Sequence, residues 1–130
     1  MKKGIWQLTV RAEFAAAHAL RHYQGACESM HGHNYKVEMA VEGEALTPDT
    51  ELLMDFTELK KILTIELEVL DHKCLNQVEP FTHLNPSSEN LAKYLWYQLT
   101  PYFVNKPAKI KSVSVSENSR QTATYWEIEE

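Results

Sequence analysis

The stretch Trp6-Gln-Leu-Thr-Val-Arg-Ala-Glu-Phe14 alternates apolar and polar side chains without a break. Alternation with a period of two is typical of a strand that buries one face, so the even-numbered residues are expected to face a core. A second alternation follows at Tyr35–Val41, where the odd-numbered residues are apolar. The two segments therefore predict strands that are each covered on one side.

Two helices are predicted after these strands. The first begins after Asp55, a good N-cap, with Glu58 three residues on in a capping-box relation. The second is capped by Ser87 or Ser88 and carries Glu89 in its first turn, where the helix dipole favours a carboxylate. Apolar residues recur at helical spacing in both segments: Leu59, Ile62, Leu63, Leu67, Leu70, Leu91, Leu95 and Leu99.

Two further strands are predicted at Ser112–Glu117 and Ala123–Ile128. The order strand, strand, helix, helix, strand, strand favours an antiparallel sheet with the helices on one face, an α+β fold. The chain has 130 residues and shows no linker or repeat. Residues 1–130 are therefore expected to form a single domain with a core of its own.

Composition excludes several classes of function. Lys and Arg number 13 against 18 Asp and Glu, a net charge of −5, and without a basic run the chain is not expected to bind nucleic acid. No apolar stretch approaches the length of a membrane span, and no signal-peptide core follows the N-terminal lysines. Two cysteines are too few for a disulfide framework, so a cytoplasmic protein with reduced thiols is expected.

The segment Cys27-Glu-Ser-Met-His31-Gly-His33 carries the densest chemistry. His31 and His33 are odd-numbered, like the buried face of the second strand, and His18 is even-numbered, like that of the first. If neither strand bulges, all three imidazoles lie on one buried face. Three neutral imidazoles suit zinc and leave one coordination position open, where the metal can polarise a substrate oxygen or activate water.

Other interpretations of these residues stay open. Cys27, four residues before His31, could be a fourth ligand and make a closed structural site. His22 and His83 are predicted to be packed or surface residues.

Two further features suggest chemistry. Asp71-His72 closes the first helix, and a carboxylate beside an imidazole can orient it or set its pKa, although taken alone the pair is better explained by polarity at a helix end. Glu117 is in phase with Val113 and Val115, so it is expected either to face inward with a partner or to turn to solvent at the strand end.

In combination, these motifs resemble the 6-pyruvoyl-tetrahydropterin synthase family. They occur in the family's order along nearly the whole chain: Phe14-Ala-Ala-Ala-His18, Cys27-xxx-His31-Gly-His33, Asp55-Phe-Thr-Glu-Leu-Lys60, Leu70-Asp-His72, Asn85-Pro-Ser-Ser-Glu-Asn90 and Val113-Ser-Val-Ser-Glu117.

The spacing around the cysteine selects a branch of the family. Three residues separate Cys27 from His31, which looks like the bacterial branch, the 6-carboxy-tetrahydropterin synthases of queuosine biosynthesis. Animal pyruvoyl-forming enzymes have a longer gap. Another branch has Glu in place of the cysteine, and Glu28 follows here, but Cys27 in the expected place argues against that branch. One departure is Asn118 after Glu117, where the bacterial branch more usually has Thr.

The resemblance implies a T-fold (tunnelling fold), a four-stranded antiparallel sheet with two helices on one face. It also implies a homohexamer of two stacked trimers, each an oligomeric barrel of twelve strands, with active sites between subunits.

The resemblance further implies the substrate, 7,8-dihydroneopterin triphosphate, and the products 6-carboxy-tetrahydropterin, acetaldehyde and triphosphate. The alternatives are a 6-pyruvoyl-tetrahydropterin synthase, which retains the side chain, and a non-catalytic zinc-stabilised module with Cys27 on the metal.

The family's roles can be carried over residue by residue. The Zn²⁺ ligands are expected to be His18, His31 and His33. The catalytic residues are expected to be Cys27 as proton acceptor, Asp71 and His72 as relay just past the helix end, and Glu117 as anchor of the pterin. The residues expected to line the pterin pocket with Glu117 are Ser87, Ser88 and Glu89. The possible triphosphate contacts are Arg21, Lys36, Lys73 and Arg120.

Overall fold

The computed structural model describes residues 1–25 and 29–130. Its elements in chain order are β1 (Trp6–His18), β2 (His31–Gly43), α1 (Phe56–Glu68), β3 (Lys73–Cys74), the 3₁₀ helix η2 (Leu75–Gln77), α2 (Ser88–Leu99), the 3₁₀ helix η3 (Thr100–Phe103), β4 (Lys109–Asn118) and β5 (Gln121–Tyr125). The predicted order of two strands, two helices and two strands is confirmed. The last strand is displaced toward the N-terminus: it ends at Tyr125 instead of Ile128.

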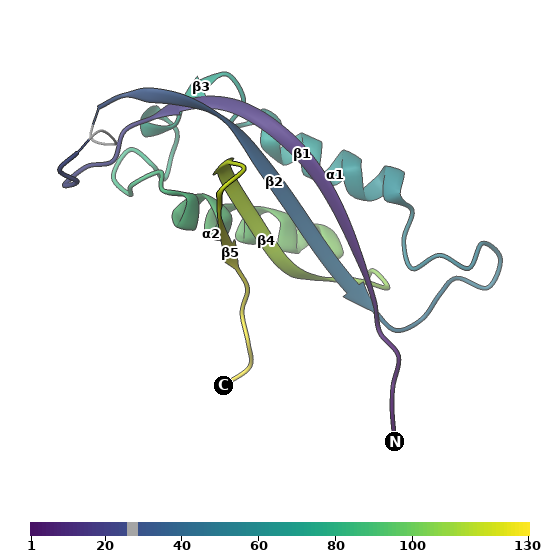
Figure 1. Ribbon diagram of the computed structural model, residues 1–130. Helices are drawn as coiled ribbons and strands as arrows, with labels where there is room; N and C mark the ends of the chain where they lie inside the picture. The colour runs from purple at the N-terminus through teal and green to yellow at the C-terminus, as the bar shows by residue number, and fades with distance from the viewer. Residues whose placement is uncertain (26–28) are drawn as a thin grey trace.

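The strands form one sheet in the order β3-β1-β2-β4-β5. The pairs β1–β2, β2–β4 and β4–β5 are antiparallel, as predicted, and β3 adds a parallel pairing to the outer edge of β1. The long curved ribbons of β1 and β2 dominate the sheet, and both helices lie on one side of it (Figure 1). Sequence reasoning missed β3 because two residues are too few to show alternation.

The pairing of β1 with β2 is unbroken from Trp6 opposite Gly43 to His18 opposite His31. Neither strand therefore bulges against the other. This was the condition on which the predicted convergence of the histidines depended.

Side-chain caps begin both helices. Asp55 Oδ1 accepts from the Thr57 amide at 2.8 Å, and Ser87 Oγ accepts from the Asn90 amide at 3.1 Å. Ser87 and not Ser88 is thus the cap of α2. Glu58 makes no return bond to Asp55 and instead accepts from Lys106 Nζ at 3.1 Å.

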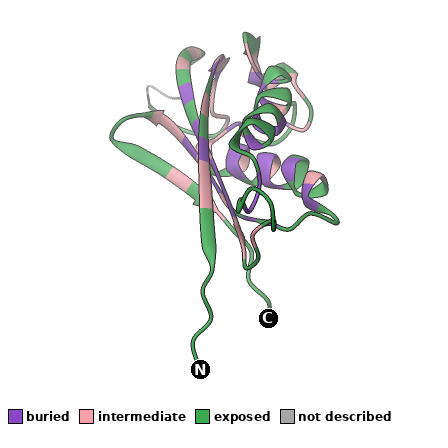
Figure 2. Ribbon diagram, turned by 90° about the vertical axis from the view of Figure 1, so that its right-hand side faces the viewer, coloured by how far each residue is buried: buried purple, intermediate pink, exposed green. Residues whose placement is uncertain are grey.

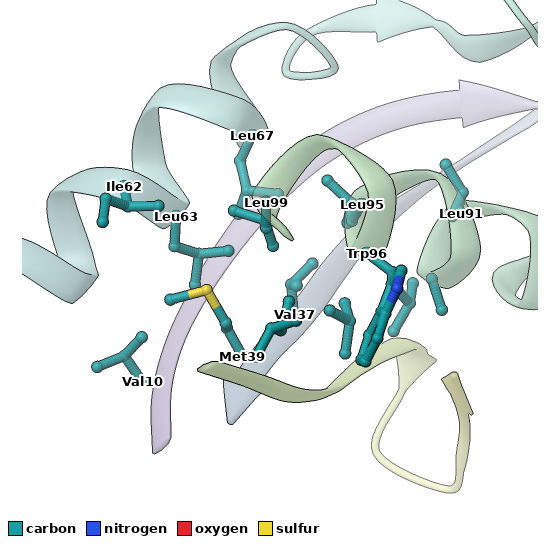
Figure 3. Close-up of a cluster of buried hydrophobic side chains, with 14 of the residues drawn as sticks. Val10, Val37, Met39, Ile62, Leu63, Leu67, Leu91, Leu95, Trp96 and Leu99 are labelled. Atoms are coloured by element: carbon teal, nitrogen blue, oxygen red, sulfur yellow. The ribbon is translucent and has the colours of Figure 1, made fainter. Parts of the chain in front are cut away.

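The core lies between the sheet and the helices, and buried segments face one another across this layer (Figure 2). The even-numbered Val10 and the odd-numbered Val37 and Met39 point into it from the sheet (Figure 3). Leucines of both helices face them. Full burial of one such side chain stabilises the fold by about 1.5–3 kcal/mol. The leucines labelled in Figure 3 are Leu63, Leu67, Leu91, Leu95 and Leu99.

The helices of the described residues are all too short or too polar to cross a lipid bilayer.

Candidate metal centre

Three histidines meet at one end of the core layer, where β1 ends and β2 begins. His18 is the last residue of β1 and lies directly opposite His31, the first residue of β2. Ala16 lies opposite His33, so His33 sits two residues along the same face. Opposite residues of an antiparallel pair share a face, which is why the unbroken register brings the three imidazoles together.

The three rings present nitrogens to one another. Nε2 of His18 is 3.2 Å from Nε2 of His31, and one nitrogen from each ring lies within 4.8 Å of the other two. The rings meet edge to face, with centroids 4.7 to 5.2 Å apart. Nε2 of His33 is buried and has no hydrogen-bond partner among the described residues. Three converging imidazoles with one orphaned nitrogen are a donor set that fits a divalent transition metal ion.

Backbone carbonyls orient two of the rings. Nδ1 of His18 lies 2.7 Å from the Pro86 carbonyl oxygen, and Nδ1 of His31 lies 2.6 Å from that of Ser29. A proton on each Nδ1 satisfies its carbonyl and leaves Nε2 as the lone-pair nitrogen that faces the centre. Burial lowers the pKa of His18, which favours the neutral, metal-binding form.

Glu117 closes one side of the cluster. Its Oε2 lies 3.5 Å from Nε2 of His33 and its Oε1 lies 3.8 Å from Nε2 of His18, while Ser88 Oγ donates to Oε1 at 3.3 Å. Only 17% of the Glu117 side chain is exposed. Of the two interpretations, the structure favours the inward-facing carboxylate, with Ser88 as its hydrogen-bond partner. The β4–β5 register shifts between Ser116 and Asn118, so Glu117 sits at an irregularity of the kind that re-aims side chains near functional sites.

Tyr35 forms the floor beneath the histidines. Its ring stacks on that of Phe14, with the ring centroids 4.8 Å apart. It meets the rings of His18 and His33 edge to face, with centroid distances of 5.7 and 5.5 Å. The side chain is fully buried, and its hydroxyl has no hydrogen-bond partner among the described residues. Burial, with a smaller effect of the Glu117 charge, raises the pKa of Tyr35, so the phenol stays protonated.

Asp71 and His72 lie just past the end of α1, as predicted. Asp71 Oδ1 accepts from the Ala15 amide at 2.8 Å, and Asp71 Oδ2 lies 2.9 Å from Nδ1 of His72. The bond from Ala15 is the main cause that lowers the pKa of Asp71. His72 has a left-handed backbone (φ 59°), and its amide donates to the Ala15 carbonyl at 2.6 Å, which starts the path into β3.

Of the relay pair, His72 lies at the surface of the chain. His72 is 82% exposed. It lines an open hollow of about 480 Å³ together with His33 and Lys73. Within the described ranges, no hydrogen bond or ion pair joins Asp71 or His72 to the three clustered histidines.

A second hollow of about 270 Å³ is lined in part by Glu117. All four residues predicted for the pterin pocket line it: Ser87, Ser88, Glu89 and Glu117. It is completed by residues that sequence reasoning missed: Leu20, Gln121, Thr122 and Ala123. Leu20 comes from the loop after β1 and the other three from β5, and no motif marked any of them. The β4–β5 pairing brings the residues of β5 to Glu117.

The basic residues predicted to contact the triphosphate differ in how free their side chains are to bind it. Arg21 donates to the carbonyl oxygens of Phe81, Leu84 and Thr82 at 2.7, 2.9 and 3.2 Å, which makes it a structural residue. Lys36 lines a hollow with Arg11 on a different part of the sheet. Lys73 is the candidate that shares a hollow with a site residue. Cys27 lies outside the described residues, so its predicted role stays a prediction.

Comparisons with known proteins agree with this geometry. The family described as "6-pyruvoyl tetrahydropterin synthase" matches residues 7–128. A "6-pyruvoyl tetrahydrobiopterin synthase" of Drosophila melanogaster is 33% identical over 132 residues, which cover 91% of this chain and 77% of the relative. A "6-carboxy-5,6,7,8-tetrahydropterin synthase" of Synechocystis is 30% identical over 126 residues, covering 94% of each. The solved 6-pyruvoyl tetrahydropterin synthase of Caenorhabditis elegans superposes with a TM-score of 0.85 at 27% identity, over 98% of this chain and 99% of that one.

Proposed function

The chain belongs to the 6-pyruvoyl tetrahydropterin synthase family, and from that premise we propose that it is a zinc-dependent 6-carboxy-5,6,7,8-tetrahydropterin synthase. In this proposal it is a carbon–carbon lyase that converts 7,8-dihydroneopterin triphosphate, with water, to 6-carboxy-tetrahydropterin, acetaldehyde and triphosphate. The pathway it would serve is queuosine biosynthesis.

One observation carries the proposal: three imidazoles converge beside a carboxylate that also borders a small hollow. Nε2 of His18 lies 3.2 Å from Nε2 of His31, and Glu117 both lies against the cluster and lines the 270 Å³ hollow. A flat heterocycle in the hollow can thus hold its side chain near the metal position. The spacing of Cys27 from His31 supports the carboxy-forming branch.

In the proposed mechanism, the metal ligands are His18, His31 and His33. A bound zinc ion would supply Lewis-acid chemistry to the side-chain oxygens of the substrate, acidifying the adjacent C–H bond. The Pro86 and Ser29 carbonyls keep the tautomers of His18 and His31 in the ligating form.

Glu117 would bind the pterin through N–H groups of the ring, whose donors suit a carboxylate. Ser88 Oγ already donates to Glu117 Oε1 and would keep the carboxylate oriented when the ring binds. Ser87 and Glu89 would complete the polar wall of the hollow. Lys73 is our first choice for a triphosphate contact because it shares a hollow with His72 and His33.

Proton transfer would fall to Cys27, Asp71 and His72. A free thiol has a pKa of about 8.5, so Cys27 needs a positive neighbour to accept a proton at neutral pH. The lowered pKa of Asp71 keeps this residue a carboxylate that can orient the His72 ring through Nδ1. His72 can then donate or accept a proton at Nε2.

We also propose that the active protein is a homohexamer, a dimer of trimers with active sites between subunits. The exposure of His72, which makes no hydrogen bond to the histidine cluster within the described residues, supports a site that a neighbouring subunit completes. Pairing between subunits would also cover the edge strands β3 and β5.

The test is product analysis on the purified protein. We expect one zinc ion per chain, and mass spectrometry should find 6-carboxy-tetrahydropterin and acetaldehyde, trapped as a hydrazone, from dihydroneopterin triphosphate. Absence of zinc, or of any reaction with this substrate, would contradict the proposal.

The second candidate is 6-pyruvoyl-tetrahydropterin synthase, which eliminates triphosphate and retains the side-chain carbons. The similarity to proteins of that name, including the Drosophila relative, favours it. A pyruvoyl product without acetaldehyde would decide for this candidate. The third candidate, the non-catalytic zinc-stabilised module, would show zinc but no turnover.

A further inference from the structure

The outer edge of β1 changes partners several times near the metal centre. Asp71 and His72 form hydrogen bonds with the backbone of Ala15, and β3 then pairs with Ala16 and Ala17. The pairing of β1 with β2 ends at His18. The backbone that follows His18 therefore has no strand beside it, although its amides and carbonyls still need partners.

Two asparagine side chains take the place of the missing strand. The Ala19 amide donates to Asn76 Oδ1 at 2.9 Å, and Asn76 Nδ2 donates back to the Ala19 carbonyl at 2.9 Å. The Arg21 amide donates to Asn85 Oδ1 at 2.7 Å, and Asn85 Nδ2 donates back to the Arg21 carbonyl at 2.9 Å. A carboxamide offers one acceptor and a donor in the geometry of a peptide group, so each pair repeats a step of a β-ladder.

Asn85 belongs to the loop that also holds His18. The next residue, Pro86, offers the carbonyl that lies 2.7 Å from Nδ1 of His18, a contact buried within the core. The Asn85 carbonyl accepts from Asn90 Nδ2 at 2.9 Å, which ties the loop to the first turn of α2. The Arg21 guanidinium also donates to carbonyls of this loop. Asn85 therefore joins the backbone that follows His18 to the loop whose Pro86 carbonyl contacts the His18 ring.

We propose that Asn85 is a positioning residue of the metal centre: its carboxamide bonds to the Arg21 backbone hold the Pro86 carbonyl against His18. Asn85 touches neither the metal position nor the hollow beside Glu117. It acts through His18, because a shift of the loop removes the acceptor of Nδ1 and with it the orientation of Nε2. Loss of such outer partners of a metal-bound histidine typically weakens metal affinity by about 10–100-fold. The inference rests on the proposed zinc site.

The test is the Zn²⁺ affinity of the full chain, measured by competition with a chromophoric chelator. Asn85→Ala is expected to bind Zn²⁺ about 10–100-fold more weakly than the unaltered chain, with an unchanged far-UV circular dichroism spectrum. Asn85→Asp keeps the size and the acceptor but loses the donor to the Arg21 carbonyl, and we expect an intermediate affinity. Thr47→Ala is the matched control, because Thr47 Oγ1 likewise accepts from a backbone amide, that of Leu52 at 3.2 Å, in a loop between β2 and α1.

The outcomes separate this inference from the proposed function. If the unaltered chain binds Zn²⁺ and loses it in His31→Ala, the metal site stands. Equal affinity of Asn85→Ala and the unaltered chain then overturns the positioning role alone, even if the thermal midpoint falls. If Asn85→Ala does not fold, Asn85→Asp decides by the same criterion. An unaltered chain that binds no Zn²⁺ overturns the proposed function and the inference together.

Discussion

At the scale of single residues, the candidate metal centre consists of the three imidazoles of His18, His31 and His33. His31→Ala removes a donor from the centre, and we expect zinc per chain to fall from about one to near zero, since a site with two ligands binds weakly. Elemental analysis after dialysis measures this. His83→Ala is the control, because His83 is an exposed histidine beside Glu79 and outside the cluster. Equal zinc loss from both variants would show that the cluster is not the site.

A substitution of Cys27 distinguishes the proposed catalytic site from a closed structural zinc site. We expect Cys27→Ala to retain zinc and the oligomer but to lose turnover, because the three histidines suffice to hold the ion while the proton acceptor is gone. Zinc content, size-exclusion chromatography and product formation are measured on the same sample. Loss of both zinc and folding in this variant would instead make the thiol a ligand.

Tyr35 offers a stability prediction at the floor of the site. Its hydroxyl is buried without a partner among the described residues, and an unpaired buried hydroxyl costs about 1–3 kcal/mol. Tyr35→Phe removes that cost and keeps the stacking on Phe14, so the free energy of unfolding should stay equal or rise. Urea denaturation of the metal-free protein measures it. A fall of more than about 1 kcal/mol would reveal a bound partner for the hydroxyl.

At the scale of elements, the caps of the helices have predictable weights. Asp55→Ala and Ser87→Ala each remove a bond to a first-turn amide, and each should lower the free energy of unfolding by about 1 kcal/mol. Only Ser87→Ala should also impair substrate binding, because Ser87 borders the hollow beside Glu117 and Asp55 does not. Denaturation curves and KM for the pterin measure the two effects, and an equal rise of KM in both variants would contradict this distinction.

At the scale of elements, the sequence predicted the strands best where apolar and polar residues alternate over a long stretch. The strand at Trp6–Phe14 and the strand at Tyr35–Val41 revealed their buried faces, and the unbroken register then placed His18 opposite His31. The short strand β3 carried no pattern, so the sequence could not reveal it. The same holds for Gln121, which reaches the hollow through the pairing of β5 with the neighbouring strand β4. Contacts made by backbone carbonyls, such as that of Pro86 with His18, leave no mark on residue type at all.

At the scale of the whole molecule, the sequence resemblance predicts a hexamer, and in our proposal a neighbouring subunit completes each active site. His72 points to solvent, and within the described residues it has no bond to the histidine cluster. If a neighbouring subunit supplies the relay, Cys27 and His72 of one working site come from different chains. Two inactive variants, Cys27→Ala and His72→Ala, would then each lack a different half of the site.

This arrangement predicts complementation. When the two variants are mixed one to one and allowed to exchange subunits, each site draws its thiol and its imidazole independently. About a quarter of the sites should then combine an intact Cys27 with an intact His72 from the neighbour, as expected for a cyclic heterologous interface. Activity should rise from near zero to about that fraction, with native mass spectrometry confirming mixed oligomers. If mixed oligomers form without any regained activity, both groups must come from one chain, because only then does every subunit carry a defective site.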